Sequence, residues 1–264
     1  TFIARGAHLA AMRRQGLQVQ SVHGDFRLEP VKATDDPAEV GPVDLVVVAV
    51  KTYDLEAAAK AAMPLLGPDT VVLPLLNGLD SAERLAAVLG GDAILGGMTH
   101  ISSGVPAPGV IRQVSTFRRI VLGELDGRIT PRVERTVAAL GRMGVAVEAT
   151  DDIRKVLWTK FVFIAGFSGI GALTRLEVGD YRSVPETRSL MTGLMREVEA
   201  LAHASGVALG AGVVDQALAL IDGAAAAMKP SLQRDVEAGR ASELESIIGV
   251  IRRRGRERGM ATPT

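Results

Sequence analysis

The sequence predicts an α/β fold of two domains: a doubly wound, Rossmann-type parallel sheet over residues 1–150 and an all-helical domain over residues 151–264. Two observations lead to this prediction. Strand and helix patterns alternate up to about Thr150, which is typical of a sheet covered by helices. Beyond that point the strand patterns stop and only helical ones follow. The chain of 264 residues is long enough for one or two such domains.

The strands of the first domain are short apolar runs. The clearest is 44–50, whose unbroken run of Leu, Val and Ala is typical of a parallel strand covered on both faces. Residues 17–31 indicate short strands around a turn at Gly24, and residues 104–120, broken by prolines, indicate a hairpin. The remaining strands are expected at 1–4, 70–75, 93–99 and 145–148.

The helices between these strands are expected at 8–15, 54–66, 81–89 and 129–143. Asp54 can cap the second of them, and Gly67-Pro68 ends it. The second domain is expected to contain helices at 151–167, 185–204, 213–228 and 240–258.

The first helix of the second domain is apolar on nearly every side, so we expect it to be largely buried. Lys160 lies in its middle, and a lysine is rarely buried unless its ammonium has a partner. Two interpretations follow from the residues. Either the stem packs while the amine reaches water, or the amine is a functional cation that lines a cleft.

Four polar sites follow predicted strands of the first domain. They are Arg5, Lys51, Asn77-Gly78 and the segment around His100 to Ser102. Ligands of doubly wound sheets bind beyond the carboxyl ends of the strands, where these residues are expected to lie. Taken singly, each also fits an ordinary surface turn.

Composition excludes several classes of protein. The formal charge is zero, from 30 basic and 30 acidic residues, so we expect neither nucleic acid nor an anionic membrane as a partner. Cys is absent, which excludes disulfides and suits a cytoplasmic protein. The four His show no ligand spacing, so no metal site is expected. No apolar run is expected to approach the roughly 18 residues that a membrane span needs.

A dinucleotide-binding sheet needs Gly-x-Gly-x-x-Gly after its first strand, and this motif does not occur in the sequence. If the sheet binds a dinucleotide, its first strand and phosphate loop are expected before Thr1. Arg5 would then end the second strand, where an arginine accommodates the 2′-phosphate of NADP. A surface arginine in a turn is the alternative.

Five motifs occur in a characteristic order along the chain. They are Leu-Val-Val-Val-Ala-Val-Lys51, Leu-Leu-Asn77-Gly78, Leu-Trp-Thr-Lys160-Phe, Ser231-Leu-Gln-Arg-Asp and Ser-Glu243-Leu-Glu. This ordered set resembles the ketopantoate reductase (2-dehydropantoate 2-reductase) family over almost the whole chain. The resemblance implies an NADPH-dependent reduction of a 2-keto acid to a 2-hydroxy acid, on the route to pantothenate and coenzyme A.

The resemblance also implies roles for individual residues. Lys160 matches the proton donor of the family, and Asn77 matches the residue that contacts both cofactor and substrate. Ser231 matches a substrate contact. Ser168 is counted with the substrate contacts, because it stands at one of the places where the family has an asparagine.

On the cofactor side, Lys51 and Glu243 match contacts of NADP, and Arg5 matches the contact to its 2′-phosphate. Ser102 falls where a backbone contact to the cofactor is expected.

Three positions depart from the family on the substrate side. Ile164, Ser168 and Val178 replace asparagines, so the cofactor side is kept while the substrate side is more apolar. Ketopantoate is the first expected substrate of the hydride transfer, although a more apolar pocket suits another small 2-keto acid, whose reductase is the second expectation. A non-catalytic NADP-binding sensor is the third. Apolar helical faces of the second domain can either join two copies as a homodimer or pack internally.

Overall fold

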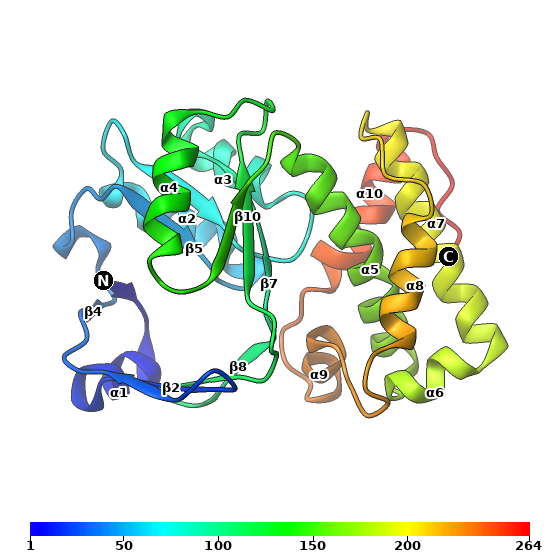
Figure 1. Ribbon diagram of the computed structural model, residues 1–264, viewed down its shortest axis with the longest axis horizontal. Coiled ribbons are helices and arrows are strands. Elements are labelled where there is room, and N and C mark those ends of the chain that lie inside the picture. The colour runs from blue at the N-terminus through cyan, green and yellow to red at the C-terminus, as the bar shows by residue number, and fades with distance from the viewer. The chain divides into compact units, whose positions relative to one another are not determined.

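The computed structural model describes residues 1–264, and its contacts divide the chain into two compact units. Figure 1 shows an α/β part built around a sheet and a part built from helices only, which confirms the predicted fold class. Unit 2 contains the helices after Asp151. It also contains two short segments that follow sheet strands, Val50–Leu55 and Leu76–Arg84. The rest of the chain forms unit 1.

The main strands of unit 1 form short ladders. They are β1 (Phe2–Ile3), β4 (Ala33–Thr34), β5 (Leu45–Val48), β6 (Val71–Pro74), β7 (Gly96–His100), β10 (Arg119–Gly123) and β11 (Ala146–Ala149). Strand β1 pairs with β4, β5 with β6, and β10 with β11, all in parallel. Strand β10 also pairs with β7 in the antiparallel sense, and a single bridge from Val72 to Ile94 links β6 to the start of β7.

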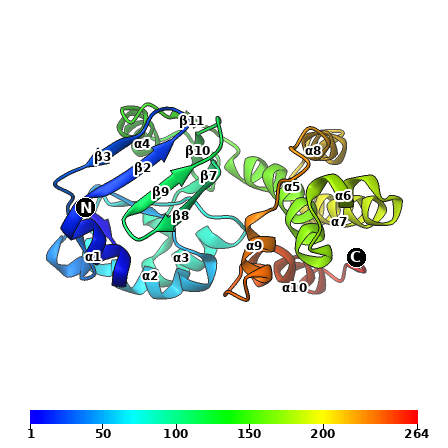
Figure 2. The same ribbon diagram turned by 90° about the horizontal axis from the view of Figure 1, so that it is seen from below.

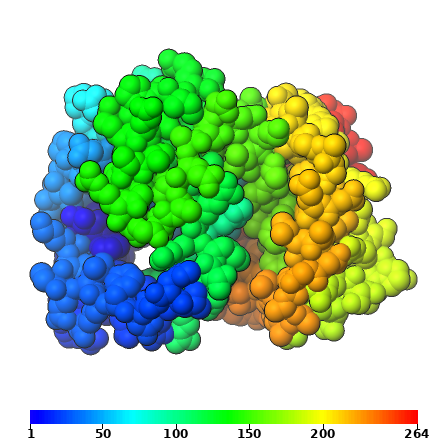
Figure 3. Space-filling view, viewed as in Figure 1, coloured from blue at the N-terminus to red at the C-terminus, as the bar shows by residue number.

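Strand β5 is less covered than the sequence predicts. Val46 and Val48 are buried, but Val47 between them is 44% exposed, so the prediction of cover on both faces is wrong there. The face of β5 to which Val47 points is therefore left partly open to solvent, and at its edges β5 pairs with β6 alone, without hydrogen bonds to the β1–β4 pair. Figure 3 shows an opening in unit 1 between the blue N-terminal residues and the green residues of the β10 and α4 region.

Helices cover both sides of this sheet. They are α1 (Gly6–Gln15), α2 (Leu55–Ala62), α3 (Ser81–Leu89) and α4 (Pro131–Gly141). Figure 2 shows α4 on one side of the strands and α2 on the other. Asp54 is the last residue of a 3₁₀ turn, Thr52–Asp54, that leads directly into α2.

A second sheet of unit 1 has the order β3-β2-β9-β8. Its strands are β2 (Leu17–Ser21), β3 (Phe26–Leu28), β8 (Ser103–Ala107) and β9 (Val110–Gln113). The predicted hairpin is confirmed as the antiparallel β8–β9 pair, and the strands predicted around Gly24 are the antiparallel β2–β3 pair.

Unit 2 is built around one long helix. Its helices are α5 (Ile153–Thr174), α6 (Val178–Ser183), α7 (Pro185–Ala204), α8 (Val213–Asp222), α9 (Ser231–Glu237) and α10 (Val250–Glu257), with a π-helical turn (Glu245–Gly249) before the last. Helix α5 begins at Asp152, whose carboxylate accepts a hydrogen bond from the Lys155 amide, and it runs seven residues beyond the predicted end at Phe167. Helix α6 was not expected from the sequence.

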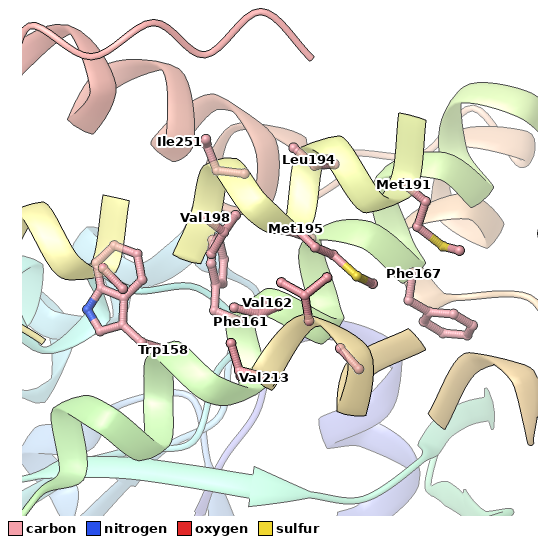
Figure 4. Close-up of a cluster of buried hydrophobic side chains, with 14 of the residues drawn as sticks. Trp158, Phe161, Val162, Phe167, Met191, Leu194, Met195, Val198, Val213 and Ile251 are labelled. Carbon is pink, nitrogen blue, oxygen red and sulfur yellow. The ribbon is translucent and has the colours of Figure 1, made fainter. Parts of the chain in front are cut away.

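The core of unit 2 forms where α5 packs against its neighbours. Figure 4 shows Phe161 and Val162 of α5 among Met195 and Val198 of α7 and Val213 of α8, and all five are buried. Helix α5 is long and apolar enough to cross a membrane, since an 18-residue window of it has a mean hydropathy of 1.6. The prediction that no apolar segment reaches this length is therefore wrong. Helices α7, α8 and α9 contact α5, and a core helix surrounded by others is expected to be apolar on all sides.

Candidate active site

Four of the predicted site residues come together within unit 2. Lys51 follows β5, Asn77 follows β6, Lys160 lies in α5, and Glu243 lies just before the π-helical turn. Hydrogen bonds join them in pairs, as described below. The fold therefore brings residues that lie 83 and 192 positions apart into contact, in one cluster of two cations, one carboxylate and one amide.

Lys160 is held by the side chain of Asn77. Its Nζ donates a hydrogen bond to Asn77 Oδ1 at 3.0 Å. Burial lowers the pKa of Lys160 from 10.5 to about 8, and the nearby charge of Glu243 acts in the opposite direction. Because a lysine with this pKa exists in both forms near neutral pH, it can release and recover a proton.

The turn that carries Asn77 needs the glycine that follows it. Gly78 has a φ of +111°, and a Cβ at this position would lie 3.3 Å from the carbonyl oxygen of Ser246. Glycine therefore lets the turn lie against the segment that carries Glu243. Since Asn77 Oδ1 accepts from Lys160, the Nδ2 group of the same amide is oriented to act as a donor.

Lys51 is bound between two carboxylates. Its Nζ lies 2.9 Å from Asp235 Oδ2 and 3.4 Å from Glu243 Oε2. Burial opposes its charge, but the hydrogen bond to Asp235 and the charges of Glu243 and Asp235 outweigh this effect and raise the pKa of Lys51. Burial likewise opposes the charge of Asp235, yet Lys51 and Arg240 lower its pKa. Both groups therefore stay ionised around neutral pH.

Glu243 connects the two lysines. It is 6% exposed, and its carboxylate accepts hydrogen bonds from the Thr52 amide at 3.2 Å and from Lys51 Nζ. A buried carboxylate needs such donors to remain charged. Its negative charge also acts on Lys160, so one carboxylate influences both amines.

Two predicted cofactor residues belong to unit 1. Arg5 is the exposed N-cap residue of α1, and no side chain caps the first turn of this helix. At Ser102, the amide donates to Ser115 Oγ at 2.9 Å and the carbonyl accepts from the Val114 amide at 2.9 Å. The amide of Ser102 is therefore engaged within unit 1, while its carbonyl oxygen keeps a second lone pair.

The predicted substrate residues differ in their surroundings. Ser168 is 4% exposed and lies two turns after Lys160, on the same face of α5 as the half-buried Ile164. Ser231 is the first residue of α9, one turn before Asp235 and on the same helix face. Val178 is fully buried in the core of unit 2, so its side chain packs against protein.

The role of Asp235 was not predicted from the sequence, where this residue is only part of a motif. An acidic residue four positions after Ser231 could have suggested a shared helix face. The contact made by Arg84 could not be predicted from the sequence, because its partner, the carbonyl of Thr52, lies 32 residues earlier in the chain.

Neither a metal site nor a second cluster with a partly neutral lysine is found elsewhere. No group of three or more His, Asp or Glu side chains is arranged to hold a metal ion. A hollow of about 400 Å³ in unit 1 lies between the turn before β6 and Arg132 of α4. The carboxylate of Glu124 already binds Arg132 there, at 2.6 Å.

Family comparisons agree along the whole chain. Residues 1–127 match the family described as ketopantoate reductase PanE/ApbA, and residues 152–264 match its C-terminal domain. A 2-dehydropantoate 2-reductase of Mesorhizobium japonicum is 30% identical, over 100% of this chain and 86% of the relative. An uncharacterized oxidoreductase of Bacillus subtilis, YkpB, is 26% identical over the same shares of the two chains.

Solved structures show the same architecture. The 2-dehydropantoate 2-reductase of Geobacter metallireducens GS-15 superposes with a TM-score of 0.91 at 35% identity, covering 99% of this chain and 87% of the other. D-mandelate dehydrogenase in complex with NADH and anilino(oxo)acetate has a TM-score of 0.87 at 21% identity, covering 97% and 84%, and this likeness shows the fold alone. With its two matching domain models, its fold and its relatives in agreement, the chain belongs to the ketopantoate reductase family PanE/ApbA, a family of oxidoreductases that use a nicotinamide cofactor.

Proposed function

We propose that the protein reduces a small 2-keto acid to the 2-hydroxy acid with NADPH, in the cytoplasm, and that Lys160 is the proton donor. Ketopantoate is the first candidate substrate and pantoate its product, which would serve pantothenate and coenzyme A biosynthesis. The observation that carries this proposal is the amine of Lys160, whose pKa is about 8 and which donates to Asn77.

The chemistry follows from the charge that develops in the reaction. A nicotinamide cofactor held at this site would supply a hydride to the carbonyl carbon, and negative charge would then develop on the carbonyl oxygen. The ammonium of Lys160 stabilises this oxygen and transfers its proton to it, which yields the hydroxyl group. The Nδ2 group of Asn77, oriented by the bond that Lys160 donates to Oδ1, is available to donate to a polar atom of the ligand.

The residues of unit 1 support NADP over NAD. Arg5 stands at the N-terminus of α1, after β1, and the first turn of this helix has no side-chain cap. A helix N-terminus with an adjacent guanidinium suits a phosphate group such as the one on the ribose of NADP. In unit 2, Lys51 supplies a second permanent cation for the cofactor.

A second candidate substrate class is favoured by the face of α5 that carries Lys160. Ile164 lies one turn after the lysine and has no donor, and Ser168 two turns after it offers one hydroxyl in place of the two amide donors of an asparagine. Val178 cannot contribute either, because it is fully buried. These residues favour a 2-keto acid with a more apolar side chain than ketopantoate.

The test is NADPH oxidation by the purified protein with a panel of 2-keto acids. The panel contains ketopantoate, pyruvate, 2-oxoisovalerate and phenylglyoxylate, with NADH as the alternative cofactor. We expect turnover with at least one acid and a preference for NADPH. Binding of NADPH without turnover of any acid would contradict the proposal and indicate a nucleotide sensor.

A further inference from the structure

Arg84 contacts all three chain segments that supply the loop-borne site residues. Its Nη2 donates to the carbonyl oxygen of Thr52 at 2.7 Å, and Thr52 follows Lys51 directly. Its Nη1 donates to Ser246 Oγ at 3.5 Å, in the segment just after Glu243. Arg84 also belongs, with Asn77, to the segment Leu76–Arg84.

Asp80 extends this network within unit 2. It lies three residues after Asn77, and its Oδ1 is 3.7 Å from Arg84 Nη1. Its other oxygen is 3.6 Å from Arg253 Nη2, and Arg253 in turn binds Glu245 in the π-helical turn at 3.2 Å. The Asn77 turn is therefore connected to the Glu243 segment by ionic contacts as well as by the close approach at Gly78.

The surroundings of Arg84 are buried and polar. Thr52 is 1% exposed and Ser246 is 7% exposed. Thr52 Oγ1 and Asp80 Oδ1 are buried without a hydrogen-bond partner. Few alternative partners are thus close at hand if the guanidinium is removed, and a buried polar group without partners destabilises its local structure.

We propose that Arg84 is a positioning residue of the active site: its guanidinium holds the Lys51, Asn77 and Glu243 segments together and thereby sets where Asn77 and Glu243 stand around the amine of Lys160. Only an arginine offers a planar fork of donors that reaches a carbonyl, a hydroxyl and a carboxylate at once. This role rests on the proposed function only in so far as Lys160 is the proton donor.

A purely structural role is the alternative, and the chain offers a matched control for it. Arg254 binds Glu83 at 2.7 Å, which also ties α3 to α10, and its side chain is only 14% exposed. No hydrogen bond from Arg254 reaches the Lys51, Asn77 or Glu243 side chains or the Thr52 carbonyl. An Arg254→Met variant therefore removes a different ion pair of α3, the one to α10, without loosening the three segments.

The experiment compares Arg84→Met, Arg84→Lys and Arg254→Met in the full chain. Lysine side chains are labelled with ¹³C at Cε, the Lys160 resonance is assigned by its loss in Lys160→Gln, and its titration is followed by NMR. Thermal unfolding and kcat as a function of pH are measured on the same samples. Arg84→Lys keeps the charge opposite Asp80 and serves as the milder variant if Arg84→Met does not fold.

We expect the titration midpoint of Lys160 to rise by about one pH unit in Arg84→Met, because a loosened cluster admits water to a buried amine. Reduction at neutral pH should slow about ten-fold, since small displacements of catalytic groups cost rate. Arg84→Lys should show a smaller change of the same sign, and Arg254→Met should change only the unfolding temperature.

Two results would overturn the proposal. One is a folded Arg84 variant with an unchanged Lys160 titration. The other is an equal shift in Arg254→Met, which would make the effect one of general packing. If the protein reduces no 2-keto acid, the proposed function fails, but the NMR titration still decides the role of Arg84.

Discussion

Two lysines of unit 2 show how differently the same side chain can be tuned within one cluster. Lys51 has a side chain that is 40% exposed, and two carboxylates raise its pKa. Lys160 faces a neutral amide from an apolar helix, and burial lowers its pKa to about 8. Glu243 acts on both, so the difference comes from burial and from the second partner, Asp235 or Asn77. The comparison supports the proposal that Lys51 serves as a fixed charge and Lys160 as the group that exchanges a proton.

The strongest test removes the lysine that titrates. Lys160→Ala should lower kcat for reduction by about 10²–10⁴, the usual contribution of a general acid. Binding of NADPH, measured by fluorescence titration, should change little, because the substitution leaves Lys51 and Arg5 in place. Lys155→Ala is the control, since Lys155 is an exposed lysine of the same helix and should behave like the unmodified protein. Full activity of Lys160→Ala would refute the proton-donor role.

The pH dependence of the unmodified protein separates the two lysines without any substitution. Lys160 is protonated below its pKa and neutral above it, so kcat for reduction should be constant at low pH and fall above about 8. The decline should approach about ten-fold per pH unit, as for loss of a single proton. The reverse oxidation needs the neutral amine and should rise over the same range. A flat profile between about pH 6 and about pH 10 would assign the proton to another group.

Glu243→Gln should lower the pKa of both Lys51 and Lys160. Its charge raises the pKa of Lys160, so its removal should move the decline in kcat to lower pH and reduce the rate at about pH 8 roughly ten-fold. Glu245→Gln is the matched control, because that side chain is 84% exposed and binds Arg253 instead. An unmoved profile in Glu243→Gln would mean that the carboxylate does not act on the amine.

The smallest effect is expected from Asp235→Asn, which alters the Lys51 side alone. Loss of the 2.9 Å ion pair should lower the pKa of Lys51 and raise the Kd for NADPH about 2–5-fold, in line with the modest strength of partly exposed pairs. The Lys160 profile should stay where it is. Glu237→Gln on the same helix is the control, since Glu237 binds Lys229. Tighter NADPH binding by Asp235→Asn would mean that Asp235 restrains Lys51 instead of orienting it.

Much of the fold could be predicted from local patterns. Helices α3 and α7 have the predicted bounds, because apolar periodicity runs through both, a proline opens α7, and a glycine lies just after the end of each. Helix α6 and the π-helical turn escaped prediction, since they depend on tertiary packing. The exposure of Val47 was not predicted for a related reason. A run of valines indicates that a strand can be buried, but the elements that pack against the strand determine whether it is buried.

The candidate site was predictable only as a set of residue types in a recognisable order. That order suggested Lys51, Asn77, Lys160 and Glu243, and hydrogen bonds within unit 2 join these four in two pairs. The sequence could not give the partner of each group, which decides the protonation of both lysines. Asp235 and Arg84 illustrate the point, because each acts on a group more than 30 residues away.

The π-helical turn at Glu245–Gly249 sets the direction in which Glu243 points relative to the helix that follows the turn. Such a turn holds one residue more than an α-helical turn, and each residue of a helix advances by about 100° around the axis. Val250 and Ile251 anchor the following helix in the core. A deletion of one residue in the turn would leave that anchor seated and swing Glu243 by roughly a quarter of a revolution, away from both amines.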